Sequence, residues 1–130
     1  MDTHVLVWLD AGSPRLGART LDQINDAFSL GNLAVSAVSF WEISMLVQKK
    51  RLEIRLETDI WRKELLENGL REIQLDGAIA IRAGELRQFH GDPADRMIVA
   101  TAQQMSWTLA TADKRILDWK NLKLKIDARR

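Results

Sequence analysis

The chain contains no cysteine, and this absence excludes disulfide bonds, catalysis by a thiolate and zinc sites built from cysteine. It has only two histidines, His4 and His90, which are too few for a metal site made mainly of imidazole groups. A metal ion would therefore be held by oxygen ligands, and such ligands favour magnesium or manganese.

Neither sign of charge predominates in the sequence. Nineteen lysine and arginine residues stand against eighteen aspartate and glutamate residues, which gives a net charge of +1. The chain as a whole therefore lacks the strongly basic character that favours binding to nucleic acid. If the protein acts on RNA or DNA, the positive surface has to be local or has to come from a second subunit. Two short basic runs, Gln48–Arg51 and Lys114–Arg115, are candidates for that local surface.

The sequence also lacks an apolar run of membrane-spanning length and a recognisable signal peptide. With 130 residues, of which 46% are hydrophobic, it is long enough for one compact domain with a real core. We therefore expect a single domain over residues 1–130, located in the cytoplasm and without a membrane partner.

Short apolar strands alternate with amphipathic helices along the chain. Apolar spacing predicts helices over residues 18–29, 40–50, 58–68, 77–88 and 93–105. Strands are predicted near residues 33–35, 72–75, 108–110 and 122–126. Thr58 or Asp59 is expected to cap the third helix. This order predicts the α/β class, with a mainly parallel sheet flanked by helices.

Four acidic residues stand beside these predicted elements: Asp2, Glu42, Asp95 and Asp113. Asp95 falls in the first turn of the predicted helix 93–105, where the helix N-terminus stabilises a carboxylate. Each of the other three stands next to a predicted strand or an apolar segment. Functional groups gather at the carboxyl ends of parallel strands, so we expect the four carboxylates to lie close together.

Four clustered carboxylates repel one another at neutral pH unless their pKa values rise or a cation binds between them. Two-metal nucleases and phosphatases use such clusters, in which cations activate water and stabilise the leaving oxygen. Each acid alone also has a structural explanation as a helix cap, a turn residue or part of a solvated helix face. The combination of acids, rather than any single one, indicates a metal site.

Several neighbouring residues are given structural roles. Asp92 is interpreted as a helix cap or turn residue. His4 and His90 are expected to pack or to form hydrogen bonds rather than to bind metal. The two terminal arginines, Arg129 and Arg130, are expected to form a frayed tail.

Four sequence blocks resemble the PIN-domain ribonucleases, and in particular the VapC-type toxins of bacterial toxin–antitoxin pairs. They are Asp2–Leu9 with an opening Asp-Thr-His, Val38–Ser44 with Trp-Glu-Ile, His90–Ala102 with Asp-Pro-Ala-Asp-Arg, and Leu109–Asp113 with a closing Thr-Ala-Asp. The third block is the most specific of the four. Their order and spacing extend over nearly the whole chain, so the resemblance implies a PIN-like domain.

The resemblance implies that Asp2, Glu42, Asp95 and Asp113 form a magnesium or manganese site at which water is activated to hydrolyse an RNA phosphodiester bond. Asp2 and Asp95 are expected to bind the metal, and Glu42 and Asp113 to act directly or through bound water. The protein would then be an endoribonuclease and the toxin of a type II toxin–antitoxin system.

Supporting roles and partners are also implied by the resemblance. Thr111 would form a hydrogen bond with a ligand carboxylate or with the water, and Arg96 would support Asp95 or contact a phosphate. The partners implied are an RNA substrate, a second copy of the chain in a homodimer, and a small antitoxin whose C-terminal segment lies across the active site.

The start of the sequence differs from that of the relatives. In them a short apolar strand precedes the first aspartate, whereas here Asp2 follows Met1 directly. Either the sequence is truncated at this point or the sheet is built differently. A missing central strand would leave backbone groups of its neighbours unpaired, so we expect lower stability and impaired catalysis in that case. We also expect the free α-amine beside Asp2 to compete with a cation.

Two other functions remain open at this point. One is a catalytically impaired PIN-like module that binds RNA or a partner protein without cutting. The other is a receiver-type phosphoacceptor domain, which also gathers acids and magnesium at strand ends. Such domains have paired acids after the first strand and an acceptor aspartate after the third, a pattern that Glu42 and Asp95 on helices do not match.

Overall fold

Seven helices and four short strands make up the fold, and a computed structural model describes all of residues 1–130. The strands are β1 (Ala34–Ser36), β2 (Arg71–Ile73), β3 (Leu109–Thr111) and β4 (Lys125–Asp127). The helices are α1 (Thr3–Ala11), α2 (Ala18–Ser29), α3 (Ala37–Gln48), α4 (Thr58–Glu67), α5 (Gly77–Gly84), α6 (Pro93–Met105) and α7 (Lys114–Leu117). The predicted α/β class with parallel strands is confirmed. No helix combines the length and the apolar character needed to cross a membrane.

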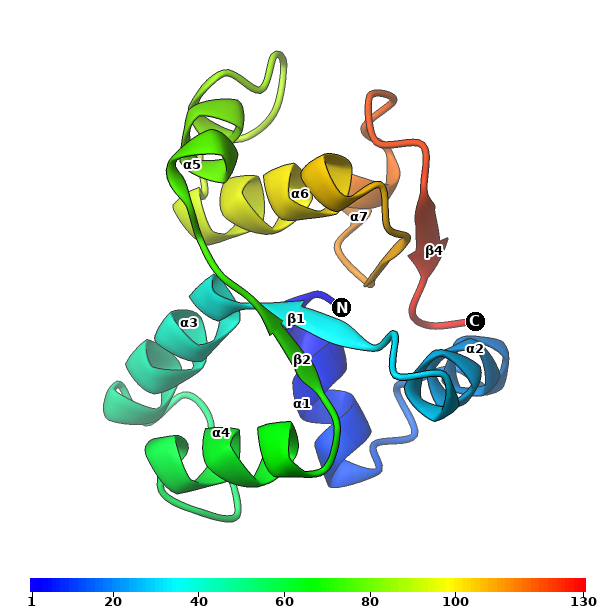
Figure 1. The fold of residues 1–130 in the computed structure, drawn as a ribbon, viewed down its shortest axis with the longest axis vertical. Coiled ribbons are helices and arrows are strands. Elements are labelled where there is room, and N and C mark those ends of the chain that lie inside the picture. The colour runs from blue at the N-terminus through cyan, green and yellow to red at the C-terminus, as the bar shows by residue number, and fades with distance from the viewer.

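The strands form two parallel pairs, β1 with β2 and β3 with β4. The N-terminus of the chain lies beside β1, near the middle of the molecule (Figure 1). There the α-amine of Met1 donates a 2.9 Å hydrogen bond to the carbonyl of Ala34 in β1. The amide of Asp2 donates a 2.9 Å hydrogen bond to the carbonyl of Ala110 in β3. Residues 1 and 2 therefore join the two pairs of strands.

Asp2 is the N-cap of α1, and its side chain accepts a hydrogen bond from the amide of Thr3. On the other side of Met1, a groove of about 510 Å³ separates β1 from β3. Burial lowers the pKa of the Met1 α-amine to about 6, because desolvation outweighs the opposing charge of Asp2.

Most helices lie close to their predicted ranges, and α2 and the end of α6 match them. Neither Thr58 nor Asp59 caps α4, because both lie within its first turn and Glu57 takes the N-cap position. Helix α5 stops at Gly84 instead of continuing to Gln88, and the four-residue α7 was not predicted. Helix α1 was not predicted either, and it includes most of the Asp2–Leu9 block.

Two hydrophobic clusters lie on either side of the junction between the strand pairs. The larger one packs α1, α3 and α4 against β1 around the fully buried Trp61. The indole nitrogen of Trp61 donates a 2.8 Å hydrogen bond to Asp10 at the end of α1. The second cluster packs α6 against β3, α7 and Trp119. Together they hold the amino ends of α1 and α6 near β1 and β3, where the acidic residues lie.

The C-terminal residues are anchored, so the prediction of a frayed tail is wrong. The carbonyl of Arg130 accepts a hydrogen bond from the amide of Arg19, and the side chain of Arg129 donates to the carbonyl of Ala112. A Cβ atom at Gly17 would lie 2.1 Å from the carbonyl carbon of Arg130, so this close approach requires glycine. The sequence-based expectation missed this contact because it joins distant parts of the chain.

Arg96, in the first turn of α6, organises the segment between α5 and α6. Its guanidinium donates hydrogen bonds to five carbonyl oxygens, those of Ala83, Gly84, Leu86, Phe89 and His90. These bonds turn the chain away from the helical path after Gly84, which explains the early end of α5. They also hold His90 close to α6.

Replacing Arg96 with alanine should lower the free energy of unfolding by about 2–4 kcal/mol, because several carbonyls lose a charged donor at once. The matched control is Arg87→Ala, since the Arg87 side chain is exposed and forms none of the hydrogen bonds or salt bridges of the fold. The control should change stability by less than about 0.5 kcal/mol. Urea denaturation measures both changes, and equal losses would contradict this role of Arg96.

Candidate metal centre

One cavity collects the acidic side chains at the carboxyl ends of β1 and β3. It has a volume of about 320 Å³. Its lining residues are Asp2, His4, Trp8, Glu42, Asp92, Asp95, Ala112, Asp113, Arg115 and Arg129. The four acids predicted from the sequence therefore line a single cavity, although they come from four separate segments of the chain.

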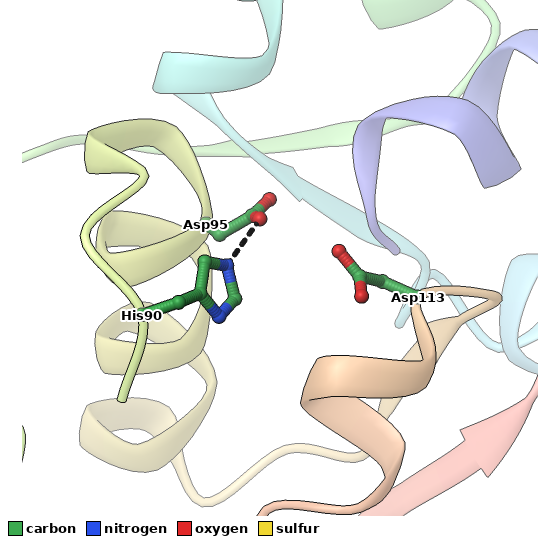
Figure 2. Close-up of side chains that lie close together, drawn as sticks. All are labelled: His90, Asp95 and Asp113. Carbon is green, nitrogen blue, oxygen red and sulfur yellow. Dashed lines mark hydrogen bonds and ion pairs between the residues drawn. The ribbon is translucent and has the colours of Figure 1, made fainter. Parts of the chain in front are cut away.

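Asp95 reaches this cavity because of the way α6 begins. Asp92 is the N-cap of α6, Pro93 occupies the first turn, and the Asp92 carboxylate accepts a 3.1 Å hydrogen bond from the amide of Asp95. The Asp95 side chain is buried, and one of its oxygens lies 2.7 Å from Nε2 of His90 (Figure 2). The ring of Phe89 packs against the ring of His90, and Trp119 packs in turn against Phe89. Asp95 is therefore held in a defined orientation.

Asp95 belongs to two sets of potential ligand atoms. In the first set, carboxylate oxygens of Glu42, Asp92 and Asp95 all lie within 4.8 Å of one another. In the second set, a ring nitrogen of His90 and carboxylate oxygens of Asp95 and Asp113 also lie within 4.8 Å of one another. Figure 2 shows Asp113, at the start of α7, facing His90 and Asp95 across the cavity. Carboxylate oxygens, which predominate in both sets, suit magnesium and manganese.

Asp2 lines the same cavity but belongs to neither set. One of its carboxylate oxygens accepts a 2.7 Å hydrogen bond from the amide of Thr3. The other accepts a 2.6 Å hydrogen bond from the hydroxyl of Thr111. The predicted pairing of Thr111 with an acidic side chain is thus present, and together with the Thr3 amide it fixes the orientation of the buried Asp2 carboxylate.

Burial and mutual repulsion shift the pKa values of the acids. Burial is the main cause that raises the pKa of Asp95 to about 6, and the charges of Asp2, Asp92 and Asp113 add to it. The pKa of Glu42 is also raised, mainly by burial and further by the charges of Asp2 and Asp92. A cation among these groups would relieve the repulsion, so the donor set fits a divalent metal.

Arg115 places a positive charge against the acids. Its guanidinium lies 3.0 Å from a carboxylate oxygen of Asp113 and 3.4 Å from one of Asp95. Partial burial acts to raise the pKa of Asp113, but the hydrogen bonds and charge of Arg115 hold it below its usual value. The Arg115 side chain is 60% exposed, so its ion pairs are individually weak. A metal ion could displace it at small cost.

Three residues that contact the acids or could bind a metal with them were absent from the predicted catalytic set. Asp92 caps α6 as predicted, but it also contributes an oxygen to the first ligand set. His90 forms the expected hydrogen bond, but its ring also belongs to the second set. Arg115 was noted only within a basic run. The sequence did contain a signal for Asp92. The carboxylate at the N-cap of a helix lies beside the residue three positions later, which here is Asp95.

Similarity to known proteins agrees with this geometry. The PIN domain family matches residues 1–121 of the chain. The chain belongs to the PIN domain family. This PIN domain is 34% identical over 117 residues to Ribonuclease VapC22 of Mycobacterium tuberculosis, and the alignment covers 89% of the chain and 87% of that protein. Family membership also removes the receiver-type alternative.

A solved structure supports the fold of this PIN domain. A chain in a toxin–antitoxin complex from Klebsiella pneumoniae superimposes with a TM-score of 0.62. The superposition covers 98% of the PIN domain and 94% of that chain, at 21% sequence identity. At 21% identity, the superposition shows that the two chains share a fold.

The raised pKa of Asp95 predicts a pH-dependent stability in the presence of a chelator. The folded protein holds this proton up to about pH 6, whereas the unfolded chain releases it near the ordinary value of 3.8. The protonated Asp95 side chain therefore contributes fully to the free energy of unfolding below pH 3.8. This contribution is lost as the pH rises towards 6. Relative to Asp95→Asn, the wild type should therefore lose about 2 kcal/mol of unfolding free energy between pH 4 and pH 6.5.

Urea denaturation at several pH values measures this difference. Asp76→Asn is the matched control, because Asp76 caps α5 outside the cavity. Its stability curve should run parallel to that of the wild type. An Asp95→Asn curve that also runs parallel to the wild type would contradict the pKa assigned to Asp95.

Proposed function

We propose that this PIN domain is a metal-dependent endoribonuclease that acts as the toxin of a type II toxin–antitoxin system. The observation that carries the proposal is the convergence of Glu42, Asp92, Asp95 and Asp113 on one cavity. The 34% identity to a protein named as a ribonuclease, over most of both chains, supports the same activity.

The acidic cluster suits a divalent metal, and we propose magnesium or manganese. Asp95 is the central ligand in this proposal, because it belongs to both ligand sets. Glu42 and Asp113 would hold the metal directly or through water, and Asp2 lines the same cavity. The bound metal would supply a polarised water and stabilise negative charge on the phosphate.

Other residues of the chain orient these acids. The Thr111 hydroxyl holds the Asp2 carboxylate, and His90 holds that of Asp95. The guanidinium of Arg96 is committed to backbone carbonyls, including that of His90, so we assign it a supporting role rather than a phosphate contact. Arg115 and Arg129 line the cavity and supply the local positive charge that an RNA phosphate needs.

We propose three further properties for the assembled protein. A small antitoxin covers the cavity, as suggested by the fold shared with a chain of a toxin–antitoxin complex. The enzyme acts as a homodimer, in which the second subunit adds positive surface to a chain of net charge +1. Residues 1–130 act as one domain, and the RNA substrate is met in the cytoplasm.

Asp95→Asn should lower manganese-dependent RNA cleavage by a factor of about 10³ or more, because the shared ligand loses its negative charge. RNA binding should persist, since the basic residues remain. Cleavage of a labelled RNA and its binding by fluorescence anisotropy measure the two effects. Asp76→Asn is the control and should keep full activity. RNA binding without cleavage by the wild type would instead support the impaired PIN-like module.

Arg115→Gln should bind Mn²⁺ several-fold more tightly than the wild type, because the metal no longer has to displace a guanidinium from Asp113 and Asp95. Lys114→Gln removes a neighbouring positive charge that is not paired with these acids, and it should change the affinity less. Isothermal titration calorimetry on the metal-free proteins measures both affinities. Equal effects of the two substitutions would show that only the net charge matters.

A further inference from the structure

Two aromatic residues of α1, His4 and Trp8, line the acidic cavity but have no role in the proposed metal site. They are four positions apart, so their side chains are neighbours on the same face of the helix. Asp2 lies at the amino end of α1, where the acids gather. The wall that α1 contributes is therefore acidic at its start and aromatic over the following two turns.

The other four tryptophans have different surroundings. The indole nitrogens of Trp61 and Trp119 donate hydrogen bonds within the protein. The ring of Trp107 lies 5.1 Å from the guanidinium of an arginine. The side chain of Trp41 is exposed, but it does not line the cavity. Trp8 is therefore the tryptophan that a ligand of the acidic cavity can reach.

The Trp8 side chain is held in place by its surroundings and still has a free polar group. The ring is partly buried and packs against the larger hydrophobic cluster. Its indole nitrogen forms no hydrogen bond within the protein and is not buried. Two residues further along, Asp10 accepts a 2.8 Å hydrogen bond from Trp61 and lies 3.0 Å from the guanidinium of Arg55. This end of α1 is thus fixed, and little side-chain freedom is lost when a ligand contacts Trp8.

Charge alone gives the cavity little attraction for RNA. Five carboxylates line it together with two arginines, Arg115 and Arg129, so negative charge remains even after one divalent ion has bound. Arg115 is also paired with two of the acids. Phosphate contacts provide the affinity of strongly basic proteins, whereas this chain has a net charge of +1. Another interaction therefore has to contribute, and stacking of a base on an aromatic ring needs no basic surface.

We propose that Trp8 and His4 form a nucleobase subsite, in which an unpaired base of the RNA stacks on the indole ring and the imidazole forms the adjoining wall. This inference rests on the proposed ribonuclease function. Six residues separate Asp2 from Trp8, which is about 9 Å along a helix that rises 1.5 Å per residue. The stacked base therefore belongs to a nucleotide next to the phosphate at the acidic cluster.

The subsite also defines the class of substrate. A base inside a duplex is stacked on its neighbours and has no free face, so the subsite selects single-stranded segments of RNA. Stacking on Trp8 accepts any of the four bases, because each has a π-face.

RNA binding by Trp8 variants tests the subsite in the Asp95→Asn protein, which is expected to bind RNA without cutting it. The probe is fluorescein-labelled octauridylate, which forms no duplex. Trp8→Leu keeps an apolar side chain but removes the ring, and it should weaken binding at least tenfold in fluorescence anisotropy. Trp8→Phe keeps a ring and should weaken binding less than threefold. Equal affinities of the leucine and phenylalanine variants would overturn the proposal.

Trp41→Leu is the matched control, because it removes an exposed tryptophan that does not line the cavity. It should leave the affinity unchanged. Losses of equal size for Trp41→Leu and Trp8→Leu would contradict a subsite at Trp8. Urea denaturation of each variant shows that the proteins compared are folded.

Photocrosslinking locates the base without any change at Trp8. An octamer of 5-bromouridine, irradiated in complex with the Asp95→Asn protein, should form a covalent bond to the aromatic side chain beside a stacked base. Mass spectrometry of the tryptic peptides should find the RNA on Trp8 or His4. Crosslinks confined to other peptides would overturn the proposal.

Cleavage assays separate this inference from the proposed function. With manganese and an otherwise wild-type chain, Trp8→Leu should raise KM about tenfold and change kcat less than about threefold, because stacking stabilises the bound substrate and the transition state alike. Cleavage with an unchanged KM would leave the ribonuclease function standing and overturn the subsite. Crosslinking at Trp8 without cleavage by the wild type would support the subsite and contradict the ribonuclease function.

Discussion

Two backbone hydrogen bonds at the start of the chain hold the halves of this PIN domain in register. One joins Met1 to Ala34 of β1, and the other joins Asp2 to Ala110 of β3. They position the first turn of α1 between the strand pairs, where the Asp2 carboxylate reaches the hydroxyl of Thr111. The acidic cavity depends on this placement, because its remaining acids come from the elements packed on either side.

The way in which the acids are held explains how they tolerate one another. Asp2, Asp92 and Asp113 are the N-caps of α1, α6 and α7, and each accepts a hydrogen bond from a backbone amide of its helix. Asp95 lies in the first turn of α6. The amino ends of three helices therefore meet around one cavity, and their amides and dipoles offset part of the carboxylate repulsion.

Sequence patterns predicted the features that depend on residues close together in the sequence. The bounds of α2 follow from apolar spacing, and the motifs pointed to four of the five acids of the cavity, whereas Asp92 was interpreted only as a cap. The early end of α5 was missed because Arg96, on another helix, binds the carbonyls beyond Gly84. The anchoring of the C-terminus was missed for a similar reason, since it depends on a close contact at Gly17 that no local pattern reveals.

The distance along the chain between members of the site has a consequence for its synthesis. The contact between Asp2 and Thr111 spans 109 positions, and Asp113 lies beyond it. A chain emerging from the ribosome presents Asp2 and Glu42 long before Asp95 and Asp113 have been translated. Contacts between such distant residues are also slow to form, because a long loop must close first. The nascent polypeptide therefore carries an incomplete acidic site while its own messenger RNA is still being translated beside it.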